Sequence, residues 1–180
     1  MKVTGIVRCV DDLGRIVIPK EVRKTMKIKE GDPMEIFVDH EGEVIFKKYS
    51  PVKEVEGVAQ DYAESLNEAT GRVVCITDRY SYIAVSGLPR KDFLNRPVSQ
   101  VVEKAMESRE SLIINNTADH ALYLEAEEVS RFIHEAIVPI ISEGETVGAV
   151  IVGTRDRKAE MNESDLKYAE TAALFMAKQV

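Results

Sequence analysis

The stretch GIVRCVDDLGRIVIP (residues 5–19) sets the pattern for the first part of the chain. Valine and isoleucine on either side of the Asp-Asp-Leu-Gly turn predict two short strands, at residues 3–10 and 15–18. The proline that follows lacks a backbone N–H, which ends the second strand and suits the first turn of a helix over residues 20–26. Residues 34–38 and 43–48 flank Asp-His-Glu-Gly and predict a hairpin.

This first unit is too small to enclose much core by itself. Units of about fifty residues need a metal, disulfides or oligomerisation to be stable. Cys9 and Cys75 lie far apart in the sequence, with no second thiol or histidine at ligand spacing, so neither a disulfide framework nor a metal site is expected. The alternative that remains is an obligate dimer built from shared strands. Ser50-Pro51 marks the expected boundary, with domains at residues 1–52 and 53–180.

Charge is unevenly spread along the chain. The whole sequence has a net charge of −7, yet residues 1–29 hold eight basic and three acidic groups, a local net of +5. Residues 53–180 hold 14 basic and 22 acidic groups, a net of −8. Because charges are screened over about 8–10 Å, a polyanion senses the surface it approaches and not the total. The pattern predicts one basic end that faces a polyanion.

The second domain shows the periodicity of an α+β fold. Apolar residues at helical spacing predict a helix from about residue 52 to Gly71, another after Pro97, and a last one capped by Asn162 or Ser164. A less regular stretch, residues 116–131, is expected to contain a further helix. Strands are predicted at residues 72–77, 82–85, 112–115, 135–141 and 146–154. We expect an antiparallel sheet with helices packed on it.

The last helix has a stripe of small residues that predicts close helix packing. Together with the apolar stripe of the first helix of this domain, it suggests a bundle with a partner chain, and hence a tetramer. The stripe consists of Ala169, Ala172, Ala173 and Ala177.

No pattern of catalytic or cofactor-binding residues is recognisable. The glycine-rich phosphate loops are missing, and Ser86-Gly87 lacks the Gly-x-Ser-x-Gly context of a nucleophile. We therefore expect no catalytic residue, no metal and no cofactor. Asp11 and Asp12 are interpreted as a turn cap or a brace for an arginine, Cys75 as a core residue, and His40 and His134 as turn and strand-edge residues.

Two family resemblances are evident once these residues are placed. The run from Gly5 through Arg15 and Pro19 to Ile36 resembles the swapped-hairpin domain of AbrB-type transition-state regulators. The patterns VCITD (residues 74–78), IAVSG (83–87) and VGAVIV (147–152) resemble a GAF domain. The combination is similar to sporulation regulators of endospore-forming bacteria. It implies an AbrB-like β-barrel dimer formed by two interleaved hairpins, followed by a GAF-like antiparallel sheet with packed helices.

The resemblance also implies a function. Members of the AbrB family bind double-stranded DNA, and the regulators activate some genes and repress others. The family's basic positions fall on Arg8, Arg15, Arg23 and Lys24. The last is often arginine, and lysine lacks the planar five-donor fork. A basic residue is also frequent where this chain has Cys9, so somewhat weaker phosphate contacts are expected.

Two alternatives to a transcription regulator remain open for the function. AbrB-like folds also occur in antitoxins, but those usually end in a short disordered tail, whereas about 130 residues here have globular periodicity. A GAF-like hydrolase is disfavoured because no nucleophile and base converge. The GAF domain is expected to oligomerise and could bind an unknown small-molecule effector. No apolar run is long enough for a membrane span or a secretory signal, so a cytoplasmic, nucleoid-associated location is expected.

Overall fold

The computed structural model describes residues 5–120 and 132–180. The chain divides into two compact units, Met1–Tyr49 and Ser50–Val180, and each is described by itself. Both units combine helices with an antiparallel sheet, so the α+β class expected from the sequence is confirmed. Among the helices in the described parts of the chain, none has the length and apolar character to cross a lipid bilayer.

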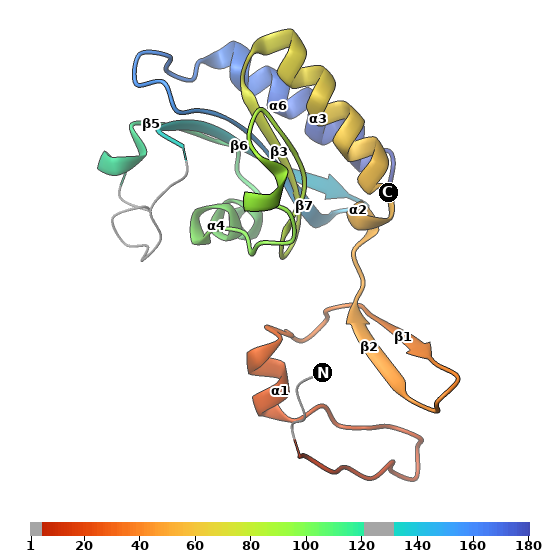
Figure 1. Cartoon of the computed structure of the whole chain (residues 1–180). Helices are drawn as coiled ribbons and strands as arrows, with labels where there is room; N and C mark the ends of the chain where they lie inside the picture. Colours follow the sequence, from red (N-terminus) through yellow and green to blue (C-terminus); the bar gives the residue numbers. More distant parts are fainter. Residues whose placement is uncertain (1–4, 121–131) are drawn as a thin grey trace. The chain divides into compact units, whose positions relative to one another are not determined.

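The first unit contains one short helix and one hairpin (Figure 1). Helix α1 spans Lys20–Thr25, and strands β1 (Met34–Val38) and β2 (Val44–Lys48) pair antiparallel with Ile36 opposite Phe46. The connecting turn is closed by Asp39, whose Oδ1 accepts hydrogen bonds from the backbone N–H groups of Glu41 and Glu43 at 3.0 and 2.9 Å. The predicted helix and hairpin are confirmed, with His40 in the turn.

The two strands predicted at residues 3–10 and 15–18 do not form within residues 5–18. These residues lie on both sides of a turn in which Asp11 N donates to the carbonyl of Arg15 at 3.0 Å. A strand exists only when its backbone groups pair with a neighbouring strand. Within the described residues of the single chain no strand pairs with this segment, so the β-forming sequence stays outside any sheet.

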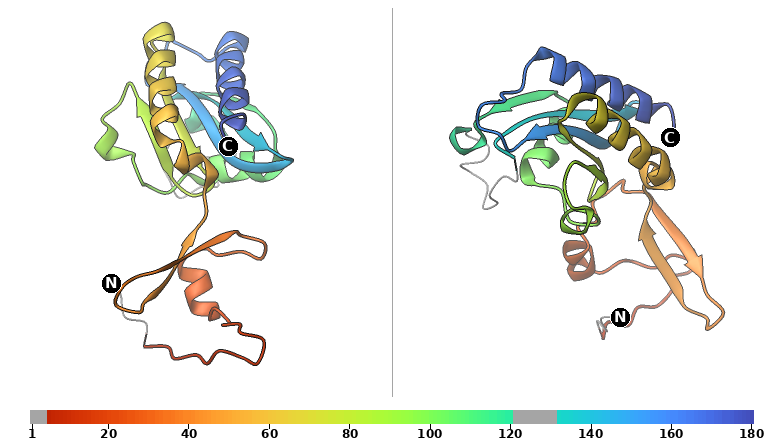
Figure 2. Two further views of the ribbon diagram at one scale, coloured as in Figure 1. Left: turned by 90° about the vertical axis from the view of Figure 1, so that its right-hand side faces the viewer. Right: turned by 45° about the horizontal axis from the view of Figure 1, so that its top comes forward.

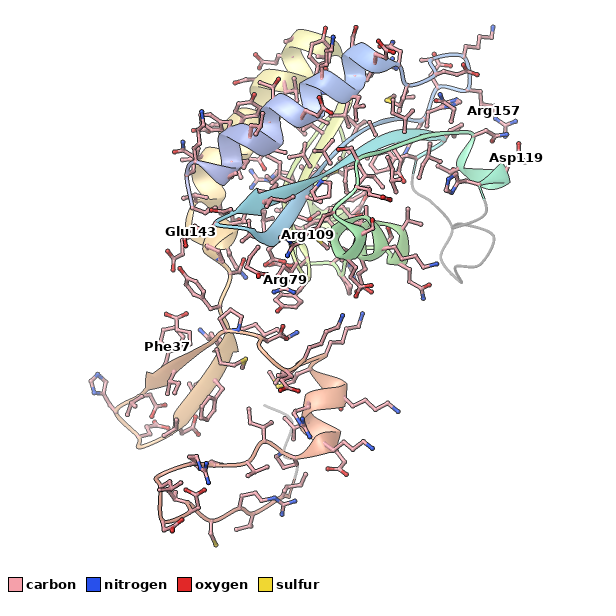
Figure 3. All side chains as sticks on the ribbon, turned by 180° about the vertical axis from the view of Figure 1, so that it is seen from behind. Phe37, Arg79, Arg109, Asp119, Glu143 and Arg157 are labelled. Carbon is pink, nitrogen blue, oxygen red and sulfur yellow. The ribbon has the colours of Figure 1, made fainter. Side chains whose placement is uncertain are left out.

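Most side chains of the first unit are open to solvent, as Figure 3 shows for Phe37 on β1. No residue between 5 and 49 is buried. Val7, Val17 and Val38 are 84, 70 and 73% exposed. This unit has an apolar surface but no core of its own.

The second unit is built on a five-stranded antiparallel sheet with strand order β4-β3-β7-β6-β5 (Figures 1 and 2). Its strands are β3 (Val73–Asp78), β4 (Tyr82–Ser86), β5 (Leu112–Asn115), β6 (His134–Ser142) and β7 (Glu145–Thr154). Its helices are α2 (Pro51–Glu54), α3 (Glu56–Thr70), η1 (Arg90–Asp92), α4 (Gln100–Ser108), η2 (Thr117–Asp119) and α6 (Glu163–Ala177). All five predicted strands and the three predicted helices of this domain are confirmed. Most of the stretch in which a further helix was expected, residues 121–131, lies outside the described residues.

Each face of this sheet is covered by helices, which gives two apolar layers. Helices α3 and α6 lie side by side on one face (Figure 2), and their cluster includes Leu66, Val138 and Val150. Helix α4 and Phe93 lie on the other face, in a cluster with Ile137 and Ile151 that we call the α4-side cluster. Successive strand residues point to opposite faces, so β6 and β7 contribute alternate residues to each layer.

The small-residue stripe of the last helix is buried inside the chain's own fold. Ala169, Ala172 and Ala173 are at most 4% exposed and pack against the sheet and α3. The expectation that this stripe meets a partner chain is therefore wrong. Small residues let α6 lie close to the sheet, and helical periodicity alone does not tell which neighbour covers them. Leu174, on the outer side of α6, is instead 66% exposed.

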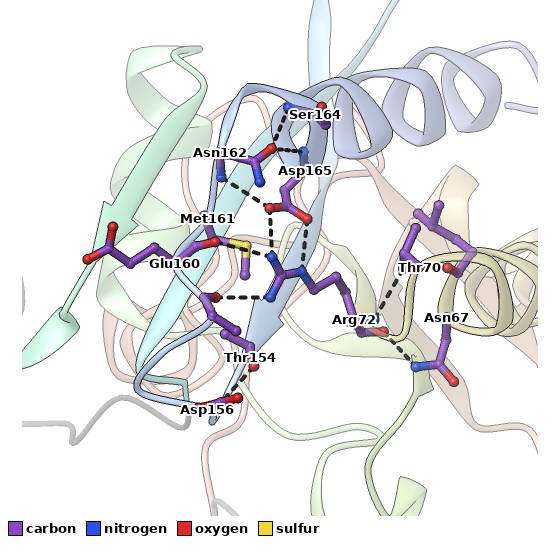
Figure 4. A network of polar contacts seen from close by, with 12 residues as sticks. Asn67, Thr70, Arg72, Thr154, Asp156, Glu160, Met161, Asn162, Ser164 and Asp165 are labelled. Carbon is purple, nitrogen blue, oxygen red and sulfur yellow. Dashed lines mark hydrogen bonds and ion pairs between the residues drawn. The ribbon is translucent and has the colours of Figure 1, made fainter.

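A polar network fixes the start of α6 (Figure 4). The Arg72 guanidinium, just before β3, donates to Asp165 and to the carbonyls of Ala159 and Glu160. Asn162 is the N-cap, because its side chain accepts from Ser164 N and Asp165 N, and Asp165 accepts from Asn162 N in return. This capping box selects Asn162 over Ser164 as the first residue of the cap.

Candidate nucleic-acid interface

Asp11 organises the turn that presents Arg15. Its Oδ1 accepts from the backbone N–H groups of Leu13 and Arg15 at 3.0 and 2.7 Å, and its Oδ2 accepts from Arg15 Nε at 2.8 Å. These bonds from the Arg15 backbone and guanidinium lower the pKa of the Asp11 carboxyl. The prediction of a turn cap and arginine brace is confirmed for Asp11, while Asp12 is simply exposed.

The two loop arginines are both accessible. The Arg15 side chain remains 67% exposed despite its ion pair. Arg8 lies in the extended segment before the turn, where its Nη1 donates to the carbonyl of Val7 at 3.1 Å. Each guanidinium has five N–H donors, so most of them stay available for an anion.

Arg23 and Lys24 lie in the last turn of α1. Pro19 precedes the helix, and its carbonyl accepts from Arg23 N at 2.9 Å. The helix ends where Lys27 adopts a left-handed conformation with φ of 50°. Ile28 N then donates to the carbonyl of Arg23 at 2.8 Å and Lys27 N to that of Lys24 at 3.3 Å, the two bonds of a Schellman motif. The backbone of both residues is thus held, and their charged side chains are exposed.

The structure therefore brings the four predicted residues together only in part. Arg8 and Arg15 share the extended segment and its turn, and Arg23 and Lys24 share one helix. Within residues 5–49, no hydrogen bond or ion pair joins the first pair to the second. A further basic residue, Lys48, has a structural role, because its Nζ lies 3.5 Å from Asp32 Oδ2 and donates to the carbonyl of Lys27.

Sequence analysis assigned roles to two residues of the second unit that the structure describes, Cys75 and His134. Cys75 is buried, as predicted. His134 is the first residue of β6, so it lies at the end of a strand as predicted, and it is 3% exposed. Its Nδ1 lies 3.1 Å from both Asn116 N and Asn115 Oδ1. Sequence analysis assigned no role to Glu135, which the structure buries. An acidic residue inside an otherwise apolar strand was the signal that could have singled it out.

Comparison with known proteins decides the family. A family model described as "Stage V sporulation protein T C-terminal, transcription factor" matches residues 54–180, more than half of the chain. Stage V sporulation protein T of Bacillus subtilis (strain 168) is 46% identical over 180 residues, which cover all of this chain and 99% of that protein. The chain belongs to the stage V sporulation protein T family. It is a sporulation transcription factor.

The first unit of this family member has relatives of its own. Transition state regulatory protein AbrB of Bacillus subtilis (strain 168) is 47% identical over 74 residues, 41% of this chain and 76% of that protein. A family model described as "Antidote-toxin recognition MazE, bacterial antitoxin" matches residues 7–54. The predicted resemblance to AbrB-type regulators is confirmed.

The second unit has the GAF fold. Residues 122 to 287 of a methyl-accepting chemotaxis protein share it with a TM-score of 0.59 at 22% identity, covering 71% of this chain and 88% of that chain. The GAF domain of a phosphoenolpyruvate-protein phosphotransferase from Coxiella burnetii gives 0.57 at 20% identity, with 69 and 81% covered. At these identities the likeness concerns the fold alone, and it confirms the predicted GAF-like sheet.

Proposed function

We propose that this transcription factor binds double-stranded DNA through residues 1–52, and that residues 53–180 assemble and regulate it on the nucleoid in the cytoplasm. The proposed contacts are Arg8, Arg15, Arg23 and Lys24. The observation that carries the proposal is that all four cations are exposed and lie within residues 1–29, which have a net charge of +5. Phosphate neutralisation and counterion release would supply the affinity.

The mode of recognition follows from the side chains that this unit offers. Residues 1–52 include no asparagine or glutamine, the residues that pair with adenine edges. Recognition would then depend on phosphate positions and groove shape, with guanine contacts from arginine.

The experiment is a salt titration of DNA binding by the full chain. Replacing Arg8, Arg23 or Lys24 with Ala is expected to weaken binding to all sequences and to reduce the slope of log K against log salt by about one per lost phosphate contact. Lys167→Ala, which removes the same charge from an exposed position on α6, is the matched control. Unchanged slopes in all three variants would exclude these residues from the interface.

We further propose that the first unit functions as a dimer of interleaved hairpins. The unit has no buried residue between 5 and 49, and its β-forming segments lack strand partners. A second copy could supply both the missing strands and the missing cover for Val7, Val17 and Val38. Val17→Asp in the full chain is expected to abolish DNA binding and to halve the mass measured by light scattering. An unchanged mass would remove Val17 from the dimer contact.

A tetramer formed through the second unit is the proposal that remains after the alanine stripe is assigned to the core. The support for this tetramer is the outer side of α3 and α6, where Val58, Tyr168 and Leu174 are exposed. Pairing two DNA-binding dimers would make the second DNA contact intramolecular and raise avidity about 10²–10⁴-fold.

The fold of the second unit also suits an effector site on the α4 side of the sheet, and we include a small-molecule effector in the proposal.

The MazE match over residues 7–54 favours a second candidate, recognition of a toxin protein by the same unit. DNA binding and toxin recognition differ in the partner and in how strongly the affinity depends on salt. If the arginine variants bind DNA as well as the parent chain does, protein recognition becomes the better explanation for this surface.

A further inference from the structure

Glu135 is a buried carboxyl on the α4 side of the sheet. Ile137, two residues further along β6, belongs to the α4-side cluster, and residues two apart on a strand point to the same face. The cross-strand neighbours of Glu135 are Ile114 on β5 and Gly153 on β7. The residue is 2% exposed.

One oxygen of this carboxyl has no partner among the residues that the structure describes. Its Oε1 is buried and accepts no hydrogen bond from any described residue. Burial raises the pKa of Glu135 to about 8. A buried polar group without a partner destabilises a fold, and an apolar residue of similar size would avoid that cost. Strongly perturbed and unpaired groups of this kind are typical of binding sites.

The residues that pair with Glu135 across the sheet, Ile114 and Gly153, carry no charge. The α4-side cluster on the same face of the sheet is apolar, and α4 contributes Val101, Val102, Ala105 and Met106 to it. Because no cation faces Glu135 from these elements, the charged form of the carboxyl lacks a counter-ion within the described part of the domain.

Aromatic rings lie beside it. A Cβ on Gly153 would stand 2.8 Å from Phe132 Cδ1, so the Phe132 ring covers the glycine next to Glu135. Phe132 and Phe93 have ring centroids 6.3 Å apart, and Phe93 meets Tyr82 edge-on at 5.7 Å. A carboxylate together with aromatic faces suits an organic cation, which gains both an ion pair and cation–π contacts. A divalent metal would need more ligands. Among the residues that the structure describes, no group of three metal-ligating side chains occurs.

We propose that Glu135 anchors the cationic group, an ammonium or guanidinium, of a small organic molecule bound on the α4 side of the sheet, beside Phe132. This rests on the effector role proposed above for the second unit. Binding would transfer the Glu135 proton to solvent, and the carboxylate so formed would accept hydrogen bonds from the ligand. The affinity therefore rises with pH, by up to about tenfold per pH unit below the pKa of the free carboxyl.

The test uses the full chain with n-butylammonium and n-butylguanidinium chloride as probes and 1-butanol as the neutral control. Calorimetry at pH 6.5 and 7.5, at constant ionic strength, is expected to show cation binding that is tighter at the higher pH. In buffers of different ionisation enthalpy the same titrations should report proton release. Glu135→Gln should weaken cation binding at least about tenfold, while Glu110→Gln, at an exposed position, should not.

Three results would overturn the proposal: no cation bound at millimolar concentration, equal affinity of 1-butanol, or unchanged affinity in Glu135→Gln. The proton-release measurement needs no variant, so the test holds even if Glu135→Gln folds poorly. DNA affinity of the same variant is measured separately. Loss of cation binding with DNA binding intact supports the site whatever the fate of the proposed DNA contacts.

Discussion

Arg72 and Asp165 form a two-pronged ion pair, with Nε to Oδ1 at 2.9 Å and Nη2 to Oδ2 at 3.0 Å, although 93 residues separate them in the sequence. The pair ties the residue before β3 to the first turn of α6. Both side chains are largely shielded, at 17 and 5% exposure. Because Asp165 also completes the capping box with Asn162, one carboxylate holds both the start of α6 and the residue that leads into β3, an interior strand of the sheet.

Removing one partner of this pair should destabilise the second unit strongly. Arg72→Ala leaves a buried carboxylate without its counter-ion, which costs about 3–5 kcal/mol of unfolding free energy. Urea denaturation of the full chain measures this loss of unfolding free energy. The control is Arg109→Ala (Arg109 is labelled in Figure 3), whose contact with Glu145 at 3.8 Å is exposed and contributes about 0–1 kcal/mol. Equal effects of the two variants would show that the buried pair does not anchor α6.

The brace between Asp11 and Arg15 should matter for DNA binding in a way that charge alone does not explain. Asp11→Asn and Asp12→Asn each remove one negative charge near the proposed interface, which by itself strengthens binding to a polyanion. Asp11→Asn also removes the ion pair that positions Arg15, so we expect it to bind DNA more weakly than Asp12→Asn does. Fluorescence anisotropy at fixed salt compares them. The same or higher affinity for Asp11→Asn would mean that Arg15 needs no brace.

Assembly through the second unit can be tested at two neighbouring positions of α6. Leu174→Glu places a charge at a residue that is 66% exposed, and we expect it to convert tetramers to dimers with little loss of stability. Ala172→Glu places the same charge at a residue with no exposure, and it should unfold the unit. Light scattering and thermal melting separate the two effects. If Leu174→Glu still forms tetramers of unchanged mass, the contact between the dimers does not involve Leu174.

Glu135 should give the second unit a pH-dependent stability. Its folded pKa of about 8 exceeds the ordinary value of 4.5, so the folded state holds the proton more tightly than the unfolded state. Its contribution is fully present below the unfolded pKa and is lost as pH rises through the folded one, at up to about 1.4 kcal/mol per pH unit. Thermal melts across this range should show a fall that is flatter in Glu135→Gln. Parallel profiles would show that another group causes the fall.

The sequence predicted the second unit well because its signals are local. Alternating apolar residues and turn residues located all five strands, and the polar residues before the last helix located its cap to within two positions. The sites that were missed depend on neighbours distant in sequence or in another chain. The segments around Gly14 have strand-forming composition but no partner strand. The alanines of α6 have a stripe that fits a sheet as well as a second helix.

The candidate sites also differ in whether their contacts are local in the sequence. Asp11 and Arg15 are four residues apart, so their contact could be expected from the turn. The burial of Glu135 depends on strands that begin at Leu112 and Glu145, and no short pattern around it reveals that it lacks a partner.

The contact between Gly153 and Phe132 constrains how this domain can change over generations. Any side chain at position 153 would meet the Phe132 ring, with a first carbon only 2.8 Å away. A substitution at 153 therefore requires either a shift of the Phe132 ring or a smaller residue at position 132. Either change alters the surface beside Glu135, which pairs with Gly153 across the sheet. We expect positions 132 and 153 to change together among descendants of this sequence.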